Sequence, residues 1–522
     1  MSYDYIVIGA GSAGCVLAAR LSENGRHRVL LLEAGGPDKR QEIQIPVAFS
    51  KLFKTEVDWN YETEPQERLH GRKLYWPRGK VLGGSSSMNA MVYQRGHPRV
   101  YDGWAELGNA GWGFQDVLPY FKKLEHFEPE ASELHGTGGP LNVTRLRDPN
   151  PLSKAFVQAC GELGLPRNDD HSGTRQEGFG LYHVTQKNGR RHSAADAWLK
   201  PALGRHNLRV ETHALATRLL FEGPRCTGVR YEQGGTRHEA RAAREVILCG
   251  GSINSPQLLL LSGIGDAAHL RELDLPVVRE LPGVGRNLRD HLLFVLNFHC
   301  KRPVSLGNAE RLGSLVRFLL LKKGPLTSNV AEAGGFLKVL ADSPVPDLQF
   351  HFGPAFFVNH GFDNPTGHGF CIGSTLVWPR SVGSLRLRAP DARVAPLLRP
   401  DYLTHEEDLT ILLEGAKLAR KISAAPALKD YLEAEYLPGP GVRDDDAMKD
   451  AIRQQVQTVY HPAGTCKMGS DAMAVVDDRL RVRGVEGLRV ADTSIMPTLV
   501  NANTQIPTLM IAEKAADLIL GR

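Results

Sequence analysis

The sequence predicts two large lobes of mixed α/β and α+β class that are interleaved along the chain. Its 522 residues exceed the ~250–300 residues at which a single hydrophobic core usually stops growing. A strand–turn–helix–strand pattern opens the chain, and buried strands followed by helices return near residues 245–262 and 488–520. Between them, alternating segments such as 348–352 and 384–388 predict an antiparallel sheet with one solvent-exposed face.

The opening segment predicts a Rossmann-like unit that binds a dinucleotide. Residues 5–8 form a strand, Gly9-Ala-Gly-Ser-Ala-Gly14 forms a turn and helix start, and a second strand over 29–32 ends at Glu33. The first glycine permits the turn, the second lets the backbone approach a pyrophosphate, and the third lets the helix pack closely. Glu33 follows at the spacing of about 20 residues expected for a carboxylate on the adenosine ribose. The predicted binding residues are therefore Gly9, Gly11, Ser12, Ala13, Gly14, Glu33 and Ala34.

The same sheet is predicted to resume twice. Residues 245–251 read as a buried strand, after which Ser255, as N-cap, and Pro256, in the first turn, open a leucine-rich helix. Residues 488–491 form another strand before Asp492, and a helix runs from Pro507 to about Leu520. We therefore assign residues 1–155, 198–296 and 455–522 to the first lobe. Residues 156–197 and 297–454 form the second lobe, which is built on the antiparallel sheet with helices.

Composition excludes several classes of protein. Sixty-three Lys and Arg residues against 58 Asp and Glu residues leave a formal charge of only +5, without a basic run that would follow a phosphate backbone, so nucleic acid is not an expected partner. Seven cysteines, an odd number without a CxxC pair, predict neither a disulfide framework nor a metal site.

Location and assembly are less strongly constrained by the sequence. The free cysteines favour a reducing compartment. The N-terminus has no basic leader, and no apolar run reaches the ~18 residues of a membrane span. We expect a cytoplasmic protein with at most peripheral membrane association, and the sequence gives no indication of oligomeric state.

Five motifs, in order, resemble the glucose-methanol-choline family of flavoprotein oxidoreductases, and the resemblance covers essentially the whole chain. The first is Gly-Lys-Val-Leu-Gly-Gly-Ser-Ser-Ser-Met-Asn at 79–89, and the second is Gly-Ser-Ile-Asn-Ser-Pro-Gln followed by a leucine run and Ser-Gly-Ile-Gly at 251–265. The others lie at residues 283–291, 460–469 and 491–497.

The resemblance implies FAD as the cofactor, a choice that the N-terminal glycines alone do not make. Met88 stands where the choline oxidases of the family carry a histidine that bonds covalently to the flavin, so non-covalent FAD is expected. The resemblance adds further cofactor-binding residues: Val81, Gly84, Asn89, Ala216, Asp492, Thr504 and Pro507.

His461 matches the family's catalytic histidine, and Asn503 matches its second catalytic position. Hydride transfer to flavin N5 requires loss of the hydroxyl proton, which a neutral imidazole can accept. An asparagine can hydrogen-bond the developing alkoxide without competing for that proton. His291, His351 and His360 are interpreted as structural or at most as pocket-lining residues.

The subgroup resemblance is to bacterial alcohol dehydrogenases and choline dehydrogenase. It implies oxidation of a primary aliphatic or arylalkyl alcohol to its aldehyde, with electrons passed to a quinone-type acceptor. An oxygen-using oxidase of the aryl-alcohol or hydroxymethylfurfural type would keep the same motifs. Two non-redox alternatives are a hydroxynitrile lyase and a light-driven fatty-acid decarboxylase, and the last alternative is a flavin-binding protein without turnover.

Overall fold

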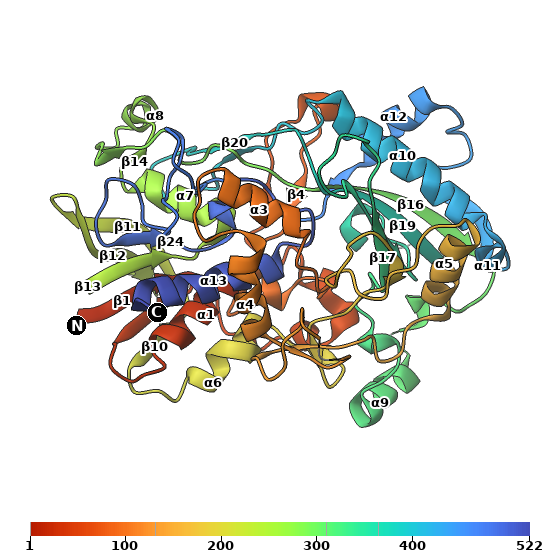
Figure 1. Cartoon of the computed structure of the whole chain (residues 1–522), viewed down its shortest axis with the longest axis horizontal. Helices are drawn as coiled ribbons and strands as arrows, with labels where there is room; N and C mark the ends of the chain where they lie inside the picture. The colour runs from red at the N-terminus through yellow and green to blue at the C-terminus, as the bar shows by residue number, and fades with distance from the viewer. Residues whose placement is uncertain (1, 131, 310, 364) are drawn as a thin grey trace.

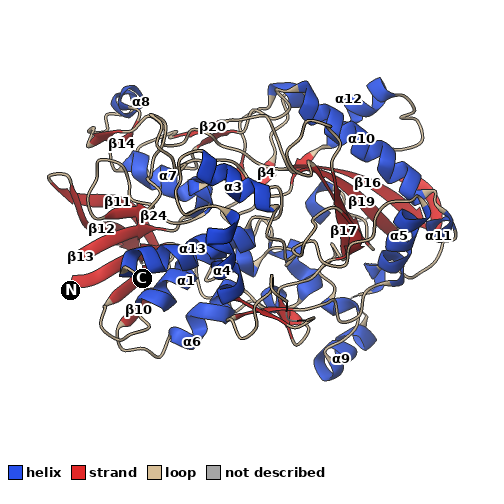
Figure 2. Ribbon diagram, in the orientation of Figure 1, coloured by secondary structure: helices blue, strands red, loops and turns tan. Residues whose placement is uncertain are grey.

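The protein contains two large sheets that lie side by side (Figure 1; Figure 2). The computed structural model describes residues 2–130, 132–309, 311–363 and 365–522. The first sheet is mostly parallel, whereas the second is antiparallel. The predicted mixed fold class is confirmed.

The first sheet is built around the predicted opening unit. Within the described residues its strand order is β10-β2-β1-β13-β12-β11, and β24 pairs with β13. Strands β1, β2, β10, β13 and β24 run parallel, and β11 and β12 add an antiparallel extension. The bounds are Ser2–Ile8 (β1), Val29–Leu32 (β2), Leu208–Glu211 (β10), Ala214–Glu222 (β11), Arg225–Gln233 (β12), Thr236–Leu248 (β13) and Leu488–Val490 (β24).

Two helices from opposite ends of the sequence pack together on this sheet. Helix α1 (Ser12–Leu21) follows β1, and α13 (Gln505–Leu520) is the last helix of the chain. Both are apolar and almost entirely buried, as a helix enclosed on several sides requires. Their contact brings the two termini to the same side of the molecule (Figure 1).

The second sheet has the order β22-β16-β19-β18-β17-β7, and β23 pairs with β16. Helices α5 (Pro151–Glu162) and α10 (Glu406–Ser423) pack against it and against each other. The strands are Gly178–Leu181 (β7), Leu292–Cys300 (β16), Ala333–Leu337 (β17), Leu348–Gly353 (β18), Gly369–Leu376 (β19), Leu432–Leu437 (β22) and Gln457–Thr458 (β23).

The prediction that one face of this sheet is exposed to solvent is wrong. Strand β18 is buried at nearly every position. On β19, Ser374 lies against Gly415 of α10, whereas the neighbouring Gly373 lines a cavity on the other side. One face is therefore covered by helices and the other faces a cavity, so alternation in the sequence does not mark solvent here.

The other alternating segment belongs to a separate element. Strand β20 (Ser384–Arg386) pairs with β21 (Leu397–Arg399) in a two-stranded sheet, not with β18. The interleaving of the two lobes is nevertheless confirmed by the strand orders. Strand β16 crosses residue 297, where the sequence interpretation changes lobe, and the lobe boundaries themselves stay a prediction.

Two helices begin earlier than predicted. Helix α7 (Gly251–Leu261) begins four residues before Ser255, and α13 begins two residues before Pro507. Pro256 lies inside α7, where it lacks the N–H that would bond the Ser252 carbonyl. The Thr465 hydroxyl donates to that carbonyl instead, at 2.7 Å. A distant side chain thus compensates for the proline, which the local sequence could not reveal.

Candidate active site

A cavity lies between the two sheets. The ends of the parallel strands reach it, since Ile8, Leu32 and Leu248 line its wall, as expected for ligand sites at the carboxyl ends of parallel strands. Strands β16, β18 and β19 supply the opposite wall. Most of the predicted site residues line this one cavity: Gly9, Gly11, Ser12, Ala13, Glu33, Ala34, Gly84, Asn89, Ala216, His461, Asp492, Asn503 and Thr504.

Three predicted residues lie behind the lining. A side chain at Gly14 would approach the Gly9 carbonyl oxygen to 1.8 Å, so this glycine allows α1 to pack on the turn. Val81 is fully buried, and its carbonyl accepts a hydrogen bond from the amide of Gly84 at 2.7 Å. Pro507 is buried in the first turn of α13. These positions shape the wall and do not face the cavity.

The turn after β1 leaves room for a ligand at the start of α1. Gly9 has φ +98, and a side chain there would meet the Cys249 carbonyl at 2.6 Å. At Gly11 the nearest obstacle to a side chain is 3.9 Å away. The first turn of α1 carries no acidic residue. Its free amides and positive helix end therefore suit a pyrophosphate.

Glu33 directly follows β2, with its carboxylate at the cavity wall. Its Oε2 accepts a hydrogen bond from the Ala10 amide and its Oε1 accepts one from the Gly35 amide, both at 2.8 Å. Burial raises the pKa of this carboxyl to about 7 in spite of the two donors. Each oxygen retains accepting capacity for a ligand hydroxyl.

The second glycine-serine segment, η3 (Gly84–Ser87), lies against the opening turn. A side chain at Gly84 would approach Gly11 Cα to 2.6 Å. The buried guanidinium of Arg191 supports the segment by donating to the Ser86 carbonyl at 3.2 Å and to Asn89 Oδ1 at 2.7 Å. Burial lowers the pKa of Arg191 to about 9. Sequence reasoning missed Arg191, because no local pattern connects it to a segment 100 residues away.

Asp492 holds the start of α7. Its Oδ2 accepts from the Gly251 amide at 2.9 Å and from the Ser255 hydroxyl at 2.6 Å, while Oδ1 accepts from the Ser494 amide at 2.8 Å. Ser255 is therefore not the N-cap of α7. A carboxylate from the C-terminal part of the chain satisfies the helix N-terminus instead, which explains its early start.

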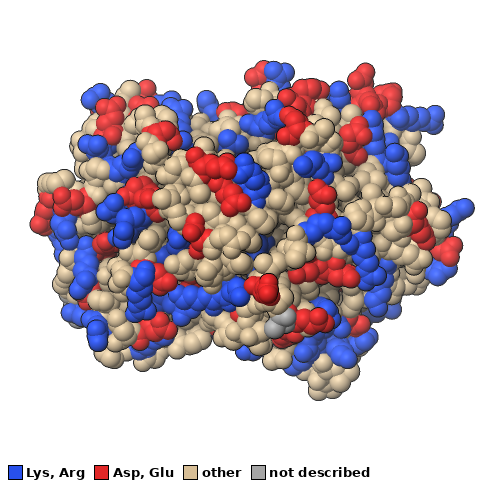
Figure 3. All heavy atoms as spheres, viewed as in Figure 1, with Lys and Arg blue, Asp and Glu red and all other residues tan. Residues whose placement is uncertain are grey.

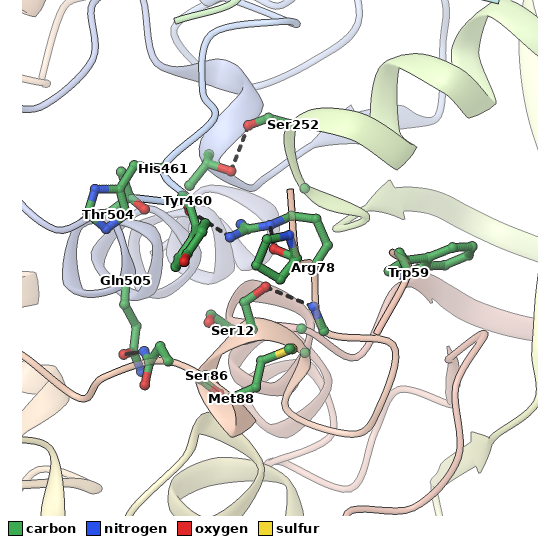
Figure 4. Close-up of a pocket in the computed structure, with 18 of the residues that line it drawn as sticks. Ser12, Trp59, Arg78, Ser86, Met88, Ser252, Tyr460, His461, Thr504 and Gln505 are labelled. Atoms are coloured by element: carbon green, nitrogen blue, oxygen red, sulfur yellow. Dashed lines mark hydrogen bonds between the residues drawn. The ribbon is translucent and has the colours of Figure 1, made fainter. Parts of the chain in front are cut away.

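His461 and Asn503 meet at the cavity wall, 3.4 Å apart between Nε2 and Nδ2. Asn503 Oδ1 accepts a hydrogen bond from Gln349 Nε2 at 3.2 Å, which fixes the amide so that its NH2 group faces His461. The His461 amide donates to Asp290 Oδ1 at 2.8 Å. Figure 4 shows His461 and Thr504 at one end of the cavity, Trp59 at the other, and Arg78 and Ser12 between them.

The imidazole of His461 is neutral. Burial lowers its pKa well below the ordinary value, and the nearby His291, His351 and Arg78 act in the same direction. We assign the Asn503 amide as the donor to Nε2, so that this nitrogen carries the lone pair and Nδ1 carries the proton. The ring therefore presents an unprotonated nitrogen to the cavity.

His291 lies behind His461, with the two Nδ1 atoms 3.0 Å apart. The Nδ1 proton of His461 points to His291 Nδ1 as acceptor, which leaves the proton of His291 on Nε2. Burial lowers the pKa of His291 to about 3, while the backbone carbonyls of Val377 and Val500 act in the opposite direction, and its Nε2 has no hydrogen-bond partner among the described residues. The interpretation of His291 as a structural or at most pocket-lining residue did not include its contact with His461. Its place at the end of the third family motif was the available signal.

Two models for GMC oxidoreductases match this chain, over residues 3–293 and 379–512. The chain belongs to the GMC oxidoreductase family. As a member it is an oxidoreductase with FAD as its cofactor, and the glycine turn, the Glu33 carboxylate and the shared cavity fit that group.

Known relatives match this member along nearly their full length. It is 45% identical to "Alcohol dehydrogenase [acceptor]" of Pseudomonas putida, over 99% of this chain and 96% of the relative. It is also 45% identical to "Oxygen-dependent choline dehydrogenase" of Brucella suis, over 100% and 96%. Among solved structures, pyridoxine 4-oxidase from Mesorbium loti shares a TM-score of 0.91 and 34% identity, over 99% of both chains.

Proposed function

We propose that this GMC oxidoreductase oxidises a primary aliphatic or arylalkyl alcohol to its aldehyde. The observation that carries the proposal is the neutral His461 imidazole facing the cavity beside the Asn503 amide. Bound FAD supplies the hydride acceptor. His461 Nε2 removes the hydroxyl proton, and Asn503 Nδ2 donates a hydrogen bond to the alcohol oxygen as it becomes an alkoxide.

The contacts around the pair support these roles. His461 is anchored through its amide on Asp290, and its ring is oriented by His291. Asn503 is held by Gln349. A base and a donor that are both oriented before substrate binds avoid part of the entropic cost of reaching the reactive geometry.

The wall next to His461 favours an uncharged alcohol. It is formed by apolar side chains such as Leu293, Val295 and Val330. Among the described lining residues, the only carboxylates are Glu33 and Asp492, and we assign both to cofactor binding. A quaternary ammonium substrate such as choline would find no further carboxylate in this lining, and its cation would depend on aromatic side chains such as Phe352, Phe357 and Tyr460.

For the cofactor, we propose non-covalent binding. Met88 is 4% exposed and lines the cavity. A thioether forms no covalent bond to a flavin under ordinary conditions, so acid or denaturant should release unmodified FAD.

In this proposal, the reduced flavin passes its electrons to a quinone-type acceptor. The name of the Pseudomonas putida relative supports an acceptor other than NAD. The test is a panel of primary alcohols of increasing chain length, assayed with a quinone-like dye and, separately, with oxygen. Dye reduction by aliphatic or benzylic alcohols without hydrogen peroxide is expected. Peroxide formation at a comparable rate would show an oxidase, and failure of every alcohol to bleach the flavin anaerobically in the dark would reject alcohol oxidation.

A further inference from the structure

Helix α9 (Leu312–Leu321) projects from the molecule with an apolar face turned outward. Figure 1 shows it at the lower right, beyond the second sheet. Its exposed apolar residues recur at the i, i+3, i+4, i+7, i+8 spacing that normally marks the buried stripe of a helix. This outer face of α9 consists of Leu312, Leu315, Val316, Leu319 and Leu320.

The exposure of this face is large for a folded protein. Leu312 is 77% exposed and Leu320 is 75% exposed, and Leu321 follows them at the end of the helix at 62%. In α9 only Phe318 is buried, in a small cluster with Ala309 and Leu326. A contiguous exposed apolar face of this kind marks an interaction surface.

Basic residues flank the outer face along the chain. Arg311 precedes the helix, and Lys322 and Lys323 follow it, whereas Arg317 within the helix pairs with Asp148 at 2.9 Å. At its base, the Arg190 guanidinium lies 6.0 Å from the Phe318 ring centre. Figure 3 shows blue basic side chains, with red acidic ones beside them, above the tan tip at the position of α9.

We propose that α9 docks on an anionic lipid surface. Its outer face enters the boundary between headgroups and acyl chains, while the flanking side chains of Arg311, Lys322 and Lys323 bind the headgroup phosphates. The helix is ten residues long, which suits lying in the interface and not crossing it. Among the described residues no helix is long and apolar enough to span a membrane.

A second copy of the chain fits this surface less well. A symmetric contact through α9 would place the basic rim of one copy against that of the other. Five side chains of a short helix also bury much less than the ~800 Å² per partner of a stable interface. Anionic lipid provides both the apolar depth and the opposite charge.

Docking through α9 would place the lipid beside the cavity. The chain continues from α9 through η6 (Pro325–Thr327) to Val330 and Ala331, which line the cavity. The cluster beneath α9 includes Val47 of η1 (Pro46–Leu52), and Phe49 of the same segment also lines the cavity. The docking follows from the surface itself and holds whatever alcohol or acceptor the enzyme uses.

The experiment is vesicle flotation of the FAD-loaded enzyme. Vesicles of phosphatidylcholine with about a third phosphatidylglycerol should bind the enzyme, vesicles of phosphatidylcholine alone should bind it at least tenfold less, and raised salt should weaken binding. The double variant Leu319→Glu/Leu320→Glu should reduce binding to anionic vesicles at least tenfold. Leu203→Glu is the matched control, since Leu203 and Leu319 are both 49% exposed.

Retained FAD and an unchanged unfolding temperature establish that the double variant is folded. Anionic vesicles that fail to bind the wild type, or that bind the double variant as well as the wild type, would overturn the proposal. So would a wild-type dimer that the double variant converts to a monomer while vesicle binding stays absent, because that result assigns the face to a second copy. Turnover with a water-soluble dye is measured separately, so loss of alcohol oxidation leaves this result readable.

Discussion

His461 and His291 face each other through their Nδ1 atoms at 3.0 Å, with their rings nearly perpendicular. One of the two nitrogens carries a proton, and the other accepts the hydrogen bond that this proton makes. With the amide of Asn503 as donor on the far side of His461, Nε2 is the unprotonated nitrogen and can take a proton from substrate. His291 is thus a positioning residue for the proposed base.

Replacement of His461 by alanine should lower the rate of flavin reduction by about 10²–10⁴ while FAD remains bound, because the proposed proton acceptor is removed. Stopped-flow bleaching under anaerobic conditions measures the rate. His405→Ala makes the same change at an exposed position outside the cavity and should have no effect. An unchanged rate in His461→Ala would remove this residue from the mechanism.

Replacement of His291 by leucine should lower flavin reduction by roughly 10–100-fold with little change in KM. The Nδ1–H of His461 would lose its acceptor, at a cost of about 1–3 kcal/mol, and the ring would leave its orientation. His291→Asn offers an amide oxygen as acceptor and should recover part of the rate. Equal losses in both variants would indicate that His291 only fills space.

Replacement of Glu33 by alanine should weaken FAD retention, since the ribose acceptor and the contacts that order Ala10 and Gly35 are lost together. The flavin-to-protein absorbance ratio after purification and dilution reports the loss. Glu211→Ala is the control, because Glu211 ends the neighbouring strand β10 but does not line the cavity. A Glu33→Ala preparation that stays fully loaded would contradict the assignment.

Stability should fall as the pH is lowered from 7 to 5. Burial lowers the pKa of His171 and His351 to about 4 and that of His291 to about 3. Below pH ~6.5 the unfolded chain binds protons that these folded sites do not, so each site costs about 1.4 kcal/mol per pH unit. Glu33 has the opposite effect. Because its pKa is raised to about 7 in the folded state, it binds a proton there at a higher pH than in the unfolded chain, which offsets the loss of stability from one histidine over the same range.

The midpoint of urea unfolding at pH 7 and at pH 5 measures the net effect of these groups on stability. A lower midpoint at pH 5 is expected because the buried histidines, which also include His183, His192 and His360 with pKa lowered to about 4, outnumber Glu33 and Asp290, whose pKa values burial raises to about 7 and about 6. A midpoint that is constant or rises would mean that these histidines become protonated without unfolding.

The sequence correctly predicted the structural elements that are determined by a few neighbouring residues. The glycine turn, Glu33 and strands β1, β2 and β24 all lie where expected, because turn chemistry and hydrophobic runs operate over a few residues. The motif match also placed His461 and Asn503 at one cavity, although 42 positions separate them.

The predictions that failed depend on contacts between residues that are far apart in the sequence. The start of α7 depends on Asp492, 241 residues away, and the contact of His291 with His461 spans 170 residues. Strand β18 looked half-exposed because its alternation does not reveal that a helix layer covers one face and a cavity lies on the other. The outward face of α9 also escaped notice, because its spacing is that of an ordinary core helix.

The order of the strands in the first sheet has a consequence for biosynthesis. Its parallel strands come from residues 2–32, 208–211, 236–248 and 488–490, and His461 and Asn503 lie near the end of the chain. A ribosome has therefore made almost all of the polypeptide before the cavity can close. Until then the glycine turn, Glu33 and the opposite wall have been made but lack the lining residues His461, Asp492 and Asn503, so firm capture of FAD should be a late, post-translational event.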